Sequence, residues 1–116
     1  MRPVLVALGW ALVAFVVWGS LTPSPPSFDI GFDQADKLEH AFAYASIMFW
    51  FAQLYARKPV RLAYAIGFVA LGIALEFIQG HVGRDFEVAD MAADALGVAL
   101  GWAAAVLIRL DLPSAK

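Results

Sequence analysis

The sequence predicts an all-α membrane protein, a bundle of four transmembrane helices with both termini in the cytoplasm. Composition is the first reason: 62% of the 116 residues are hydrophobic and the mean hydropathy is +0.74, whereas soluble domains contain roughly 45–50% apolar residues. Patterning is the second, because the charged residues, 16% of the chain, fall in short blocks between four apolar stretches. A soluble domain this short would lack the polar surface that it needs.

Each apolar stretch has the length of a membrane-spanning helix, which needs about 20 residues at about 1.5 Å per residue. The first runs over residues 3–21, with Pro3 suited to a first helical turn, and a Pro/Ser-rich segment ends it. The second and third cover residues 37–56 and 60–79; only three residues separate them, which predicts antiparallel neighbours. The fourth covers residues 86–108. We expect a single domain over residues 1–116.

The first stretch has an alternative interpretation as a cleaved signal peptide. Val17-Trp18-Gly19 loosely resembles a cleavage site of small residues. The apolar run is long for that role, however, and a tryptophan does not suit such a site, so we favour a retained helix.

Positive charge predicts the orientation, since cytoplasmic loops carry an excess of Lys and Arg. Six of the eight basic residues lie on one side of the predicted topology: Arg2, Arg57, Lys58, Arg61, Arg109 and Lys116. The other side holds Lys37, Arg84 and nine of the ten acidic residues. We therefore expect a multi-pass protein of the bacterial cytoplasmic membrane, with the segments 22–35 and 80–85 outside.

Polar residues converge at the outer ends of the last three predicted helices. They are Asp36, Lys37, His40 and Tyr44 of the second helix, Glu76 and Gln79 of the third, Arg84 of the next loop, and Asp90 and Asp94 of the fourth. Residues three or four apart share a helix face, and ionisable groups inside a membrane persist when they pair or line a wet cavity. The spacing therefore predicts one polar pocket that opens outward.

Some of these residues have purely structural explanations. Asp36 with Glu39 fits a capping box at the start of the second helix, and Lys37 fits a side chain that reaches the membrane interface. The spacing Gly97-x-x-x-Gly101 predicts a close packing surface between helices.

Glu76 and Asp94 do not have such an explanation. Glu76 lies about one turn inside the third helix at its negative end, so a positive group must compensate it; Arg84 is the first candidate and His40 the second. Asp94 lies roughly 12 Å along the fourth helix at 1.5 Å per residue, where a lone aspartate would be protonated or paired. The competing hypothesis is an ion network that only holds the helices in register.

The motifs of these helices resemble those of VanZ-like membrane proteins. Residues 36–44, DKLEHAFAY, are similar to the family element DKxxHxxxY, and Glu76-Phe77-Ile78-Gln79 with Arg84, Asp90 and Gly97 is similar to ExxQ…R…D…N…G. The resemblance covers the last three helices, about two-thirds of the chain, and Asp94 stands where the family usually has Asn. The family is named for a protein associated with low-level resistance to teicoplanin. The resemblance implies a fold and a site without defining a reaction.

We expect the pocket to bind or act on a cell-envelope molecule, such as an anionic lipid-linked headgroup or a glycopeptide. The candidate catalytic residues are His40 as proton carrier with Glu76 and Asp90 as orienting groups or acid and base; the candidate ligand-binding residues are Lys37, Tyr44, Gln79, Arg84 and Asp94. Whether a reaction is catalysed stays open. We expect no cofactor and no resident metal, although a divalent cation between Asp90 and Asp94 is a variant of this hypothesis.

Two other function classes stay open. One is a non-catalytic interaction or scaffold protein whose ionic cluster is structural. The other is a small transporter, which the first apolar stretch disfavours because it carries no ionisable residue. Membrane lipids are expected partners and assembly into a homo-oligomer stays open. The net charge of −2 argues against nucleic acid, and the absence of cysteine excludes disulfides and thiolate chemistry.

Overall fold

The computed structural model describes residues 2–21, 35–79 and 88–110, and this part of the chain is all-α. Its four helices are α1 (Arg2–Leu21), α2 (Ala35–Leu54), α3 (Lys58–Gln79) and α4 (Val88–Leu107). Their ends lie within two residues of the predicted ones, and no strand occurs among the described residues. The predicted all-α class and the four helices are therefore confirmed.

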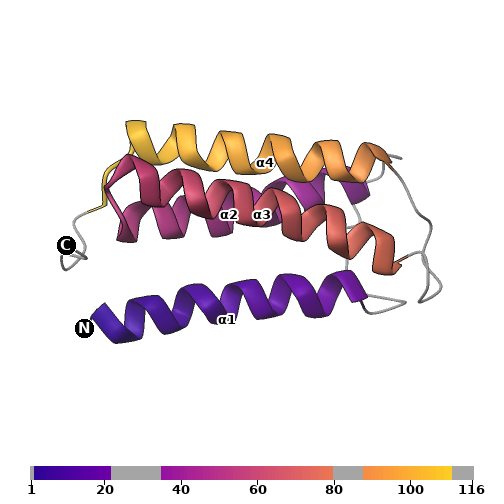
Figure 1. Cartoon of the computed structure of the whole chain (residues 1–116), viewed down its shortest axis with the longest axis horizontal. Helices are drawn as coiled ribbons and strands as arrows, with labels where there is room; N and C mark the ends of the chain where they lie inside the picture. The colour runs from indigo at the N-terminus through magenta and orange to yellow at the C-terminus, as the bar shows by residue number, and fades with distance from the viewer. Residues whose placement is uncertain (1, 22–34, 80–87, 111–116) are drawn as a thin grey trace.

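The helices run alternately up and down along one axis (Figure 1). The start of α1, the α2–α3 turn and the end of α4 therefore lie at the same end of the bundle. We call it the basic end, after its described residues Arg57, Lys58, Arg61 and Arg109. The opposite end, with the described residues Glu39, His40, Glu76 and Asp94, is called the acidic end.

The closest helix pair is α2 with α4, and two glycines make the approach feasible. A Cβ atom at Gly97 or Gly101 would overlap the backbone carbonyl oxygen of Ala41 or Ala45, respectively. Small residues on both helices let the two backbones approach each other. The predicted packing role of Gly97 and Gly101 is therefore confirmed, and their contact brings the residues beside it, His40 and Asp94, within reach of each other.

Helix α1 contacts α2 and α3 and is set apart from α4 (Figure 1). The Trp50 indole N–H donates a hydrogen bond of 2.9 Å to the Leu5 carbonyl oxygen. This is feasible because Gly9, one turn later, has no side chain: a Cβ there would lie 2.8 Å from atoms of both Trp50 and Phe51. Trp10 also packs edge-on against Phe51, with ring centroids 5.1 Å apart.

Within the part of the chain that the structure describes, two helices are long and apolar enough to cross a membrane, over Pro3–Leu21 of α1 and Lys58–Ile78 of α3. The apolar part of α4, Met91–Leu107, is shorter. Helix α2 differs because its first turns carry Asp36, Lys37 and Glu39.

Candidate functional site

A buried interaction between α2 and α4 forms the centre of the acidic end. His40 Nδ1 lies 2.9 Å from Asp94 Oδ1, and the two side chains are only 12% and 4% exposed, respectively. An ionised carboxylate can only accept a hydrogen bond, so the imidazole N–H at Nδ1 is the donor. The second ring nitrogen, Nε2, then carries the imidazole lone pair, or a second proton when the ring is charged.

Helix α3 completes the surroundings of Asp94. A Cβ atom at Gly72 would lie 2.6 Å from Asp94 Oδ2 and 3.0 Å from Asp94 Cβ, so the missing side chain makes room for the carboxylate. The sequence prediction did not include Gly72. The signal was an isolated glycine inside an apolar helix, which often has a packing reason, placed four residues before Glu76.

Tyr44 and Glu76 belong to the same buried group. Glu76 shares the α3 face of Gly72, one turn later, and is 1% exposed; Tyr44 is 2% exposed. The carboxylates of Asp94 and Glu76 both act electrostatically on the Tyr44 hydroxyl. Four predicted site residues from three helices, His40, Tyr44, Glu76 and Asp94, therefore come together, and we call them the polar cluster.

The remaining predicted site residues lie outside what the structure describes. This holds for the side chains of Lys37, Gln79 and Asp90 and for the whole of Arg84. The backbone places Lys37 in the first turn of α2, Gln79 at the last position of α3 and Asp90 one turn before Asp94. The expected compensation of Glu76 by Arg84 therefore stays a prediction. Helix α2 begins at Ala35, so Asp36 lies in its first turn and the predicted N-cap role was wrong.

The arrangement favours proton transfer and hydrogen bonding. A carboxylate that accepts a hydrogen bond from one imidazole nitrogen fixes the tautomer and the orientation of the ring. Among the described residues, no group of three His, Cys, Asp or Glu side chains is placed to hold a metal ion. The variant with a cation between Asp90 and Asp94 lies outside those residues.

The basic end contains two polar contacts that the sequence prediction missed. Arg61, 9% exposed, donates from Nε and Nη2 to the Ala52 carbonyl oxygen at 3.0 and 2.6 Å and from Nε to that of Tyr55 at 2.9 Å. The last carbonyls of a helix have no partner within the helix, and a cation there also matches its dipole. The signal in the sequence was a basic residue in the first turn of α3, close to the end of α2.

Gln53 makes the second contact, with the chain that follows α4. Its Nε2 donates to the Ile108 carbonyl oxygen at 2.5 Å, and its Oε1 accepts from the Leu110 N–H at 3.0 Å. The side-chain amide therefore holds the backbone on both sides of Arg109. No pattern in the sequence pointed to this contact.

Comparisons with protein-family models, with curated proteins and with solved structures found no match.

Proposed function

We propose that this chain is a multi-pass membrane protein of the VanZ-like type, in which the polar cluster binds or acts on a cell-envelope molecule with an anionic headgroup. The observation that carries the proposal is the buried His40–Asp94 hydrogen bond of 2.9 Å between two helices. The proposal has a membrane part and a site part, which rest on different observations.

The membrane part is supported by where the apolar side chains lie. Large apolar residues are exposed on every helix, for example Phe15, Phe42, Ile66 and Leu100, and contiguous exposed apolar surface marks contact with lipid or with another protein. Only 17% of the apolar segment in α1 and 33% of that in α3 is buried inside the bundle. A core helix of a soluble protein would be mostly buried.

Helix length and the charge distribution support four spans in one orientation. Helices of 20 to 22 residues measure about 30–33 Å, close to the hydrocarbon thickness of about 30 Å. The basic end then faces the cytoplasm and the acidic end faces outward. In a bacterium this places the protein in the cytoplasmic membrane.

The site part is supported by the chemistry of the polar cluster. Asp94 orients the His40 ring, so that His40 exchanges a proton with the ligand or donates a hydrogen bond to it through Nε2. Glu76 and Tyr44 supply further buried polar groups from α3 and α2. Lys37 and Arg84 would provide the positive charge that an anionic headgroup needs.

Native mass spectrometry of protein purified from bacterial membranes in mild detergent tests the site. The variant is His40→Gln, and the matched control is Ser46→Ala, which removes a hydroxyl that bonds only to the Phe42 carbonyl of its own helix. We expect a discrete bound mass in wild type and in the control that is lost from folded His40→Gln. Bare wild-type protein together with an unfolded variant would contradict the site.

A structural cluster is the second candidate, because His40, Asp94 and Gly72 join α2, α4 and α3 at one point. In that case the chain is an interaction or scaffold protein in the membrane. This candidate predicts that changes in the polar cluster abolish folding or assembly and remove no ligand. A small transporter stays the third candidate, disfavoured because α1 has no ionisable residue after Arg2.

A further inference from the structure

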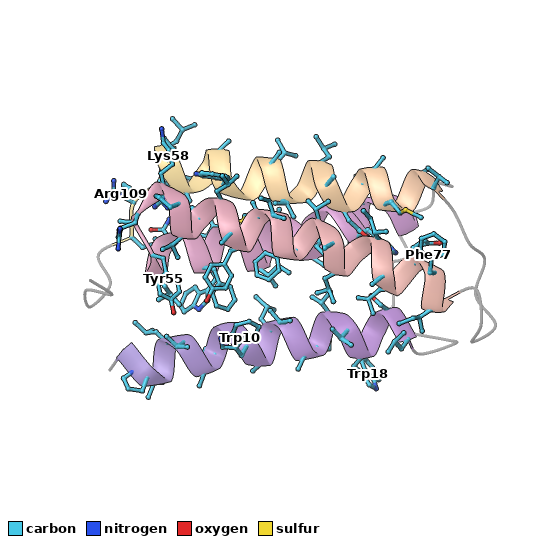
Figure 2. The ribbon with its side chains drawn as sticks, in the orientation of Figure 1. Trp10, Trp18, Tyr55, Lys58, Phe77 and Arg109 are labelled. Atoms are coloured by element: carbon cyan, nitrogen blue, oxygen red, sulfur yellow. The ribbon has the colours of Figure 1, made fainter. Side chains whose placement is uncertain are left out.

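The basic end holds a group of cations that the proposed function does not use. Arg57 and Lys58 lie exposed at the α2–α3 turn, and Arg109 lies exposed just after α4. Lys58, Arg109 and Tyr55 gather at this end of the bundle (Figure 2). Arg61, which is buried, belongs to the same end of the bundle.

The placement of these cations depends on specific contacts. Gln53 hydrogen-bonds the residue before Arg109 and the residue after it, so the backbone of Arg109 is held beside the end of α2. Arg61 is fixed by the carbonyl oxygens of Ala52 and Tyr55 in the same region. Two segments far apart in the sequence are thus joined here, one with Arg57 and Lys58 and one with Arg109.

The charges of Arg61 and Arg109 repel each other. Arg61 and Arg109 are near enough to interact electrostatically, and the contacts of Arg61 given above are to neutral carbonyls. The described acidic side chains Glu39, Glu76 and Asp94 all belong to the other end, and Asp111, which follows Arg109 in the sequence, lies outside the described residues. An anionic group between the turn and Arg109 would relieve the repulsion and accept charge-assisted hydrogen bonds.

We propose that Lys58, Arg57 and Arg109, with Arg109 held in place by Gln53, form a binding site for the headgroup of an anionic phospholipid at the cytoplasmic face. The inference rests on the membrane placement proposed above and is independent of the polar cluster. Basic pockets between helices on the cytoplasmic side are known to bind such headgroups. Here the exposed apolar side chains Val106, Leu107 and Ile108 beside Arg109 would contact the acyl chains.

The test is native mass spectrometry of the full chain in mild detergent with added phosphatidylglycerol, with phosphatidylcholine in a parallel series. We expect Lys58→Gln and Arg109→Gln each to weaken retention of phosphatidylglycerol about fivefold, because one cation near a membrane surface contributes about that factor. Phosphatidylcholine retention should not change. A millimolar excess of inorganic phosphate should not displace the lipid; displacement would assign the site to a soluble anion and overturn the lipid proposal.

Two variants distinguish a built site from general attraction to positive charge. Arg2→Gln removes a cation at the same end from α1, which does not contact α4, and should change retention less than twofold. Gln53→Ala changes no charge but releases Arg109, and should weaken retention about threefold through the lost pre-organisation. Equal losses for Arg2→Gln and Arg109→Gln, or wild-type retention by Gln53→Ala, would overturn the proposal. His40→Gln should retain phosphatidylglycerol like wild type, so failure of this site and failure of the polar cluster are separable.

Discussion

The two ends of the bundle treat buried polar groups in opposite ways. At the basic end, Arg61 and Gln53 bind backbone groups of neighbouring segments, so each polar side chain satisfies a helix end that would otherwise lack partners. At the acidic end, His40 and Asp94 bind each other, and Glu76 is buried at the negative end of its own helix. The buried polar side chains of the basic end therefore cap helix ends. The ionisable side chains buried at the acidic end cap no helix end. Burying ionisable groups is costly even when they pair, and this cost is what suggests function.

Gly97→Leu should have the largest effect on stability, because it disrupts the α2–α4 packing on which both ends depend. Any side chain at residue 97 meets the Ala41 backbone carbonyl, which cannot rotate away as a side chain could. We expect a loss of about 3 kcal/mol or more in the free energy of unfolding, measured by chemical denaturation in detergent micelles. Gly67→Leu is the control, because nothing lies within 4 Å of a Cβ at Gly67; equal destabilisation by both would contradict close α2–α4 packing.

Arg61→Ala should destabilise the protein through the basic end alone. The change leaves the Ala52 and Tyr55 carbonyls without their charged donor, and hydrogen bonds to charged groups contribute about 1.5–3 kcal/mol. We expect the free energy of unfolding, measured by thermal unfolding, to fall by that amount. The ligand bound at the polar cluster should be retained. Loss of that ligand in the folded variant would show that the two ends are not separate.

Gly72→Ala should affect the acidic end, where it changes both stability and ligand retention. The new methyl group displaces the Asp94 side chain and should weaken ligand retention, with a loss of about 1 kcal/mol in the free energy of unfolding. In the same helix, Gly67→Ala should stabilise by up to about 1 kcal/mol, because alanine is the better helix former. The two variants compared by thermal unfolding should therefore change stability in opposite directions, and a gain in both would contradict the contact between Gly72 and Asp94.

Asp94→Asn should have the smallest effect on stability. An asparagine oxygen can still accept the hydrogen bond from His40 Nδ1. We expect the free energy of unfolding to change by less than about 1 kcal/mol. Ligand retention should fall about fivefold, because a neutral amide oxygen orients the His40 imidazole less strongly than a carboxylate does. Unfolding of this variant would favour the structural candidate.

Helix bounds and the Gly97–Gly101 packing surface could be predicted because they depend on local pattern. Apolar runs bounded by Pro-rich or charged segments fixed all four helices to within two residues. The alternating directions of the helices placed His40, Glu76 and Asp94 at the same end of the bundle. The spacing of four residues put His40 and Tyr44 on one face of α2.

The partner of each polar group could not be predicted in the same way. Spacing along one helix does not determine how that helix is rotated against its neighbours, so the pairing of His40 with Asp94 follows from the α2–α4 contact at Gly97 and Ala41. The Gln53 contact was beyond reach for another reason: it joins a side chain to backbone atoms 55 and 57 residues away. Backbone atoms are the same for nearly every residue and leave no trace in the sequence.

The most direct test of the contrast between the two ends measures ligand retention and unfolding on the same sample. Native mass spectra of wild type and His40→Gln would be recorded in mild detergent while the temperature is raised. We expect folded His40→Gln to lack the mass bound at the polar cluster at low temperature. Once the stabilisation by that ligand is removed from wild type, the two proteins should unfold within a few degrees of each other. A variant that unfolds far below ligand-free wild type, together with a wild-type protein that never carries a mass dependent on His40, would contradict the proposed binding role of the polar cluster.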